Sequence, residues 1–163
     1  MLMLLFYVGD NLYALDSSQV VEVIPRVIVR KIHHVPEYVA GLFKYRGTIV
    51  PVIDICHLIQ GKPSSSHLST RIIMVNYNGK DNNKLYLGLM AERVTETLNK
   101  PESALVDAGG RGQLEQSPPY LGEMIMDDKG MIQRIRLEYL LSDSQQKFLL
   151  AGRNDANNEP GKN

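Results

Sequence analysis

The sequence lacks a second cysteine, and this absence excludes a disulfide within the chain. The only cysteine among the 163 residues is Cys56, a usage compatible with a reducing compartment. Long hydrophobic runs are also missing. The N-terminal stretch is apolar only through Val8, has no basic leading region or small-residue cleavage site, and falls short of the ~20 apolar residues of a membrane span. We therefore expect a cytoplasmic protein that does not insert into the membrane.

An excess of charge of one sign is absent as well, because 18 Lys and Arg residues balance 18 Asp and Glu residues. Tryptophan is absent and only three phenylalanines occur. Proteins that bind nucleic acid usually carry a basic face and exposed aromatic rings on which bases stack. The composition therefore predicts no nucleic-acid partner. A small β-barrel protein that binds RNA or the ribosome remains an alternative from a different functional class, which retention on a heparin column would test.

What the sequence does contain is a series of short apolar runs, rich in Val, Ile, Tyr and Leu and interrupted by Gly, Asn, Asp or Pro. Such runs are typical of β-strands. Turn signals at Gly9–Asn11, Asn78–Asn83 and Asp127–Gly130 fall between them. Many strands with short connections predict an all-β fold built from barrels or a sandwich. The predicted strands are Leu2–Val8, Asn11–Leu15, Val20–Ile24, Val27–Ile32, Gly41–Tyr45, Thr48–Ile53, Arg71–Tyr77, Leu85–Ala91, Val94–Leu98, Tyr120–Met126 and Met131–Ile135.

Helices are few and short. Asp54 is placed to cap a helical turn through Leu58, because its side chain can accept a hydrogen bond from a free backbone N–H. The apolar spacing over Leu137–Lys147 predicts a second helix near the C-terminus. Helices therefore contribute little to the predicted fold.

The remaining segments have the composition of connections. Residues 60–70 are rich in serine and predict an exposed linker between two groups of strands, and residues 99–119 predict a long loop. Residues 151–163 contain almost nothing apolar, so we expect a disordered tail there. The folded domain is accordingly expected over residues 1–150.

Residues with metal-ligand or nucleophile chemistry are scattered. In an extended chain, neighbouring side chains point to opposite faces, so the pairs His33-His34 and Cys56-His57 are poorly placed to share a metal ion. No second CxxC or HxxxH spacing supports zinc. Cys56 is therefore interpreted as a small buried apolar residue. A metalloenzyme that uses His33, His34, Cys56 and His57 stands as a third alternative, which metal analysis would decide.

No group of residues has the spacing of a catalytic site. The cluster Gly109–Gly112 is not followed by a helix, which a phosphate-binding loop requires. The Ser64–Ser66 run lacks the strand–turn–helix context of a nucleophilic serine. No two carboxylates are placed to face a substrate. The sequence thus predicts neither an enzyme nor a bound cofactor.

The segment Gly41–Asp54 is the most distinctive one. Two extended stretches meet at Arg46-Gly47, where glycine can adopt a positive φ. Arg46 is expected at the rim of an apolar strand pair. It is either a surface arginine whose stem covers apolar neighbours, or half of an ion pair that orients a binding groove. Glu22, within the apolar stretch Val20–Ile24, is the candidate partner, since a carboxylate there is on the solvent face or paired.

Taken in order, these segments resemble the CheW-like family over about residues 3–142. The strongest mark is the spacing G-x-x-x-x-R-G-x-x-x-P-V-x-D, which residues 41–54 reproduce. The other matching pieces are Phe6–Leu15, Val20–Ile24, Val35–Gly41, Arg71–Val75, Leu87–Val94 and Tyr120–Gly122.

The resemblance implies two small SH3-like, five-stranded β-barrel subdomains around a shared core, with short helices and no catalysis. It implies an adaptor that bridges the cytoplasmic tip of a methyl-accepting chemoreceptor and the regulatory domain of a CheA-type histidine kinase. It also implies an ion pair between Glu22 and Arg46, and it assigns no kinase-binding residues. The receptor-binding positions that it carries over are Val20, Glu22, Gly41, Arg46, Gly47 and Val94.

The sequence departs from the family pattern at several positions, and these departures affect which receptor is expected to bind rather than the expected fold. Ala91-Glu92 replaces Val-Asp, Thr97 replaces a valine, and Arg136 replaces an aspartate that would cap the C-terminal helix. Pieces such as Ala40–Gly47 and Val94–Leu98 look like the adaptor of Wsp-type systems. That subgroup controls a diguanylate cyclase response regulator rather than a flagellar motor, and the same pathway is expected here.

Overall fold

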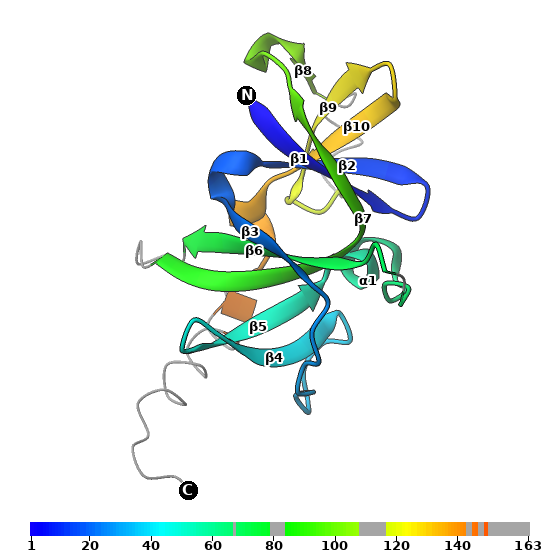
Figure 1. Cartoon of the computed structure of the whole chain (residues 1–163). Helices are drawn as coiled ribbons and strands as arrows, with labels where there is room; N and C mark the ends of the chain where they lie inside the picture. Colours follow the sequence, from blue (N-terminus) through cyan, green and yellow to red (C-terminus); the bar gives the residue numbers. More distant parts are fainter. Residues whose placement is uncertain (67, 79–83, 108–116, 143–144, 147–148, 150–163) are drawn as a thin grey trace, which may run out of the picture.

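The structure, a computed structural model, describes residues 1–66, 68–78, 84–107, 117–142, 145–146 and 149. These residues form mainly β-strands in two sheets that share one strand, so the expected all-β fold is confirmed (Figure 1). Across the described ranges, no helix has the length and apolar character needed to traverse a bilayer. Sheet A, the upper group in Figure 1, contains β1 (Leu2–Val8), β2 (Asn11–Asp16), β8 (Leu105–Val106), β9 (Leu121–Asp127) and β10 (Gly130–Ile135); sheet B contains β3 (Val20–Pro25), β4 (Val39–Tyr45), β5 (Thr48–Asp54) and β6 (Arg71–Asn78).

The shared strand is β7 (Lys84–Asn99). Its first half pairs with β6 and β5 in sheet B, and from Glu92 onward it pairs with β1 in sheet A. Just after this change of partner, Arg93 has a φ of 46° and interrupts the regular pairing with β1 as a β-bulge does. The two strands predicted over Leu85–Ala91 and Val94–Leu98 are therefore one strand, bent at the predicted break.

Alternating side chains of these strands build three apolar clusters. The central cluster draws on both sheets, with Phe6 and Leu15 from sheet A and Ile73 and Leu87 from sheet B. A second cluster is built by sheet A, and a third by sheet B together with the chain that follows β3. We call the faces that bear these two clusters the inner sides of the sheets. The shared core that the sequence predicts is thus present.

Sheet B is completed by a single bridge rather than by a further strand. The backbone of Arg30 exchanges two hydrogen bonds with Leu42 of β4, both of 2.8 Å. The strand predicted over Val27–Ile32 is wrong, because only Arg30 meets a partner strand, and Ile28 is 98% exposed. The bridge requires Gly41, whose φ is 150° and at which a Cβ would stand 2.3 Å from the carbonyl oxygen of Arg30.

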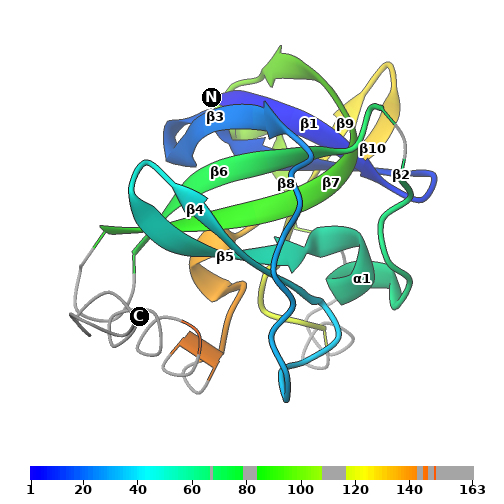
Figure 2. The same cartoon turned by 60° about the horizontal axis from the view of Figure 1, so that its bottom comes forward.

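Helix α1 (Ile55–Gln60) follows β5 directly (Figure 2). Its first turn is capped by Asp54, as predicted. Asp54 accepts a hydrogen bond from the N–H of Cys56 at 3.1 Å. The N–H of Ser64 donates to the same carboxylate at 2.8 Å, so the chain after the helix folds back on its start. The predicted linker over residues 60–70 does not separate two groups of strands, because β5 and β6 on either side of it both belong to sheet B.

The C-terminal helix begins later than predicted. Leu137–Tyr139 forms the 3-10 turn η3, and Ser142 caps the helical residues that follow. The Ser142 N–H donates to the side-chain oxygen of Gln145 at 2.7 Å, and the Gln145 N–H donates to the Ser142 hydroxyl at 3.3 Å. This reciprocal pair has the pattern of a capping box, and the described helical residues Gln145, Gln146 and Leu149 all lie beyond Ser142.

The connection from β7 to β9 is not a plain loop, because it contains the 3-10 turn η2 (Glu102–Ala104) and the short strand β8. Three predictions lie outside the described residues. They are the turn after Asn78, the glycine cluster Gly109–Gly112 and the tail over residues 151–163.

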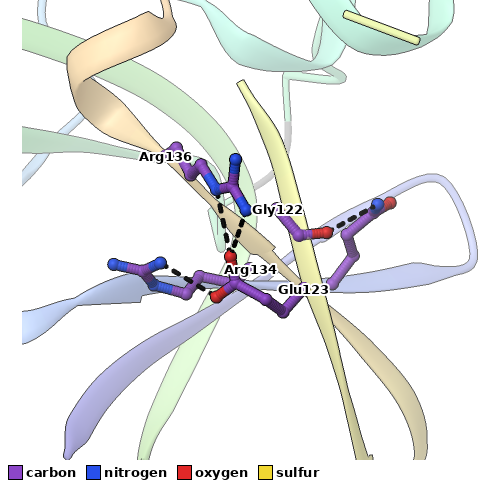
Figure 3. A network of polar contacts seen from close by, with 5 residues as sticks. Gly122, Glu123, Arg134 and Arg136 are labelled. Carbon is purple, nitrogen blue, oxygen red and sulfur yellow. Dashed lines mark hydrogen bonds and ion pairs between the residues drawn. The ribbon is translucent and has the colours of Figure 1, made fainter. Parts of the chain in front are cut away.

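A charged network lies at the edge of the inner cluster of sheet A (Figure 3). Glu123 of β9, two residues from the buried Ile125, accepts hydrogen bonds from Arg134 at 3.0 Å and from Arg136 at 3.0 and 2.5 Å. A Cβ at Gly122 would stand 3.0 Å from the carbonyl oxygen of Arg134, so glycine admits this close approach. Burial alone would raise the pKa of Glu123, but the hydrogen bonds and charges of the two arginines lower it below its ordinary value of 4.5.

We predict that Glu123→Gln lowers the free energy of unfolding by about 1–3 kcal/mol near neutral pH, because two arginines lose a charged partner. The folded-state pKa of Glu123 is lowered. Its contribution is therefore full above the unfolded-state pKa and is lost as pH falls through the folded-state pKa. Urea unfolding at about pH 7 and about pH 3 should show a smaller difference between the wild type and E123Q at the lower pH.

An equal difference at both pH values would contradict this prediction. Glu96→Gln is the matched control, because Glu96 pairs with Lys129 on the surface and is 47% exposed. It should change the free energy of unfolding by less than about 1 kcal/mol.

We also predict that Gly41→Ala lowers the free energy of unfolding by about 2–4 kcal/mol, because the new Cβ collides with backbone atoms of Arg30. Gly61→Ala is the control, since Gly61 also has a positive φ of 78° but a Cβ there meets nothing within 4 Å. Its cost should stay near 1 kcal/mol, roughly the strain of the left-handed backbone alone. Equal losses in chemical denaturation would show that Gly41 is not needed for the bridge.

Candidate functional site

A polar cluster at the rim of sheet B is built around the turn between β4 and β5. The turn consists of Arg46 and Gly47, with Tyr45 and Thr48 paired across it. Both turn residues have positive φ, 49° and 78°, as in the tightest β-hairpins. The Arg46 side chain leaves the sheet here and is 55% exposed. The backbone of the turn therefore fixes where the guanidinium emerges.

Glu22 approaches Arg46 from the terminal strand β3. A register shift between Val20 and Glu22 places Glu22 opposite Met74 of β6, whose side chain belongs to the inner cluster of sheet B. Oε1 of Glu22 then lies 3.6 Å from Nη2 of Arg46, with 41% of the Glu22 side chain exposed. The expected contact between Glu22 and Arg46 is therefore present in the structure.

Tyr45, which was not among the predicted site residues, contacts both charges. Its hydroxyl donates a 2.5 Å hydrogen bond to Oε1 of Glu22, and Cζ of Arg46 lies 5.1 Å from the centre of its ring. Burial, followed by the hydrogen bond to Glu22, raises the pKa of Tyr45 to about 12, so the hydroxyl is a proton donor at neutral pH. The sequence did contain a feature that could have identified Tyr45. Phe43 and Tyr45 are two residues apart in a strand that ends at Arg46, so both rings lie on the same face of β4.

Two further rings surround Tyr45. Tyr86 of β7 meets it edge-on, with ring centres 5.1 Å apart and an angle of 88°, and Phe43 lies 6.0 Å away. A hydrogen bond to Tyr86, followed by the nearby Tyr45, raises the pKa of Arg46. Arg46 is thus a permanent cation beside aromatic rings. This arrangement suits recognition of an acceptor on another molecule rather than proton transfer.

The other predicted receptor-binding positions divide between the site and the core. Gly47 is part of the turn beside Arg46. Val20 packs against the central cluster at the start of β3. Gly41 is buried at the bridge that completes sheet B, so the structure gives it a folding role.

Val94 lies in the half of β7 that belongs to sheet A and packs against the central cluster. It follows Tyr86 by eight residues along β7, which corresponds to about 26 Å of extended strand. Val94 therefore lies in the sheet A part of β7, whereas Arg46 lies at the β4–β5 turn of sheet B.

The candidate metal ligands are not assembled. Cys56 is fully buried, and burial raises the pKa of its thiol to about 11, as expected of an apolar core residue. Nε2 of His57 lies 3.5 Å from a carboxylate oxygen of Glu37, whereas His33-His34 is exposed in a loop. In the part of the chain that the structure describes, no three His, Cys, Asp or Glu side chains group as ligands.

Two cavities among the described residues are lined by residues other than Arg46. One of about 580 Å³ is lined by Tyr120 and Gln145 beside the C-terminal helix. Another of about 480 Å³ lies next to Ile32 and His57. Arg46 itself projects from an open surface, which favours contact with a macromolecule over enclosure of a small ligand.

Comparison with known proteins finds chemotaxis proteins. The chain is 26% identical over 93 residues to the chemotaxis protein CheW of Helicobacter pylori, a match that covers 57% of this chain and 53% of that protein. It therefore spans about half the length of that relative. Identity to the probable chemotaxis protein CheW of Rhizobium etli is 23% over 140 residues, with 86% of each chain covered.

The fold has a counterpart among solved structures. The crystal structure of the scaffolding protein TtCheW from Thermoanaerobacter tengcongensis matches with a TM-score of 0.73 and 26% identity, over 86% of this chain and 87% of that one. A family model, described as the CheW-like domain, matches residues 2–145. The chain therefore belongs to the CheW-like domain family.

Proposed function

We propose that this protein is a non-catalytic adaptor that couples a methyl-accepting chemoreceptor to a CheA-type histidine kinase. The names of the chemotaxis and scaffolding relatives support this role. The observation that carries it is the half-exposed pair of Arg46, in the turn between β4 and β5, and Glu22, on β3, which has the character of a recognition site.

In this proposal the protein works by holding its partners in a fixed geometry. The helical tip of the receptor lies against the surface of Arg46, and another face contacts the regulatory domain of the kinase. A guanidinium offers five N–H donors in a rigid fork, so Arg46 can bind a receptor acceptor while it contacts Glu22. Tethering raises the effective concentration of kinase beside receptor, and several weak contacts then act together.

The proposed receptor-binding positions fall into two regions. Glu22, Arg46 and Gly47 form the exposed region at the rim of sheet B. Val20 and Val94 flank the central cluster, where an apolar part of the receptor helix would pack. Gly41 contributes indirectly through the bridge to Arg30.

We further propose that the pathway is of the Wsp type and that its output is a diguanylate cyclase response regulator at the cytoplasmic side of the receptor. Support comes from the likeness of Ala40–Gly47 and Val94–Leu98 to the adaptor of that subgroup. The exposed turn Arg46-Gly47 lies within the first of these pieces.

We predict that Arg46→Ala and Glu22→Ala each weaken binding to the receptor cytoplasmic fragment by roughly tenfold or more, because an interface depends on a few central residues. The melting temperature of R46A should change little, since exposed ion pairs contribute little to folding. E22A should lower it more, because it also removes the acceptor of the buried Tyr45 hydroxyl. Calorimetric titration of the purified chain with the receptor fragment, alongside a melting curve, separates the two effects.

Lys129→Ala provides the matched control for this experiment. Lys129 also pairs with a carboxylate on the surface, that of Glu96, but it lies in the turn between β9 and β10 of sheet A. Its replacement should leave receptor affinity unchanged. The proposed function would be wrong if the wild type bound neither the receptor fragment nor the kinase regulatory domain.

The pathway proposal predicts that deletion of the gene lowers cellular cyclic-di-GMP on a surface and leaves swimming chemotaxis intact. Complementation with the wild-type gene or with K129A should restore the cyclic-di-GMP level, whereas R46A should not. Loss of swimming chemotaxis with an unchanged nucleotide level would instead assign the protein to a flagellar pathway.

A further inference from the structure

We infer that Tyr45 is a positioning residue that holds Arg46 and Glu22 in the arrangement the receptor recognises. The inference rests on the proposed function, because it names a residue through which the same surface achieves its specificity. Three contacts carry it: the hydroxyl of Tyr45 on Glu22, the ring of Tyr45 beside Arg46, and the packing of that ring in sheet B.

The ion pair alone gives little orientation. Its closest atoms are 3.6 Å apart, and the two side chains are 55% and 41% exposed. Exposed pairs of this kind lose much of their attraction to water and must restrain two flexible side chains. A second group is therefore needed to hold Arg46 and Glu22 in place between encounters with a partner.

Tyr45 supplies that group. Its hydrogen bond to Oε1 of Glu22 is 2.5 Å long, and a hydrogen bond to an ionised carboxylate is stronger than one between neutral groups. The face of its ring attracts the guanidinium of Arg46, whose Cζ is 5.1 Å from the ring centre. One side chain thus restrains both members of the pair.

The ring of Tyr45 is itself fixed. It is only 7% exposed and belongs to the inner cluster of sheet B. Tyr86 packs against it edge-on at 5.1 Å, and Phe43 lies 6.0 Å away on the same strand. The neighbouring backbone is paired with Thr48 across the turn. Tyr45 therefore connects the packed interior of sheet B to both members of the exposed pair.

This arrangement indicates the chemistry that the partner offers to Arg46. Glu22 and Tyr86 cannot occupy all five N–H donors of the guanidinium, and the side chain faces solvent. A receptor helix that brings a carboxylate or backbone carbonyl oxygen to this point would meet donors already oriented. Such preorganisation increases affinity because less freedom is lost on binding.

The first test compares Tyr45→Phe with Tyr45→Leu in the full chain. Y45F removes the hydrogen bond to Glu22 and keeps the ring, so we expect receptor affinity to fall about three- to tenfold. Y45L removes both contacts and should weaken binding further. Tyr77→Phe is the matched control, because Tyr77 is fully buried and its hydroxyl accepts a 3.0 Å hydrogen bond from Gln146, far along the sequence from Arg46. Y77F should bind as the wild type does.

A double-mutant cycle then separates positioning from general packing. If Y45F acts through the hydrogen bond to Glu22, it should cost little or nothing when Glu22 is already alanine, so that the two effects do not add. Additive losses in Y45F/E22A would overturn the inference, and so would wild-type affinity in a folded Y45F.

A measurement without any partner keeps the inference testable if the proposed function fails. In nitrogen-15 NMR spectra, the Nε–H of Arg46 should exchange with water several-fold faster in Y45L than in the wild type, and no faster in Y77F. Unchanged exchange in Y45L would mean that Tyr45 does not hold Arg46. If the wild type binds no receptor fragment, the proposed function is wrong, and the NMR result alone decides the role of Tyr45.

Discussion

Strand β7 is hydrogen-bonded in both sheets, and this double membership constrains the rest of the molecule. Its first half lies between β6 and β5, and its second half pairs with β1. Leu87, Leu89 and Ala91 from the first half enter the central cluster, which residues of sheet A complete. Because one continuous backbone passes through both sheets, a displacement of sheet A against sheet B must disrupt strand pairing or the core. The proposed adaptor role, with one face for a receptor and another for a kinase, would need such a fixed relation between the two faces.

The inner side of each sheet has a glutamate–arginine contact at its edge, and the two contacts differ in burial. Glu123 is 15% exposed and accepts hydrogen bonds from both Arg134 and Arg136. Glu22 and Arg46 are about half exposed and lie 3.6 Å apart. A buried charge without its partner is costly, whereas an exposed pair can be opened at little cost. The first contact is therefore suited to stabilising sheet A. The second is suited to exchanging partners with another molecule.

Features that depend on residues close together in the chain were predicted from the sequence, whereas features that depend on distant segments were not. Short apolar runs bounded by turn residues predicted most strands, and Asp54 was identified as a cap, because these features depend on neighbours in the chain. The strand over Val27–Ile32 and the linker over residues 60–70 were wrong because pairing with β4 and return to sheet B are set by distant segments. Of the site, Arg46 and Glu22 could be predicted from pattern and resemblance. The contact of Tyr45 with Glu22 could not be predicted, because it depends on how β4 lies relative to β3 in the folded chain.

The backbone at Arg46 links folding to recognition. Among the described residues, Arg46 and Arg93 are two of the three that adopt a positive φ without being glycine, a conformation disfavoured for residues with a Cβ. In both cases the guanidinium lies over a tyrosine ring, Tyr45 for Arg46 at 5.1 Å and Tyr7 for Arg93 at 4.1 Å. Asparagine or glycine would satisfy a tight hairpin with less strain, but neither could make such a contact or reach a partner. Strained backbone persists where the surrounding structure compensates for it. The contact between the Arg46 guanidinium and the Tyr45 ring can offset the strain of the Arg46 backbone. The turn can therefore contain an arginine, which has the donors that the proposed binding role requires.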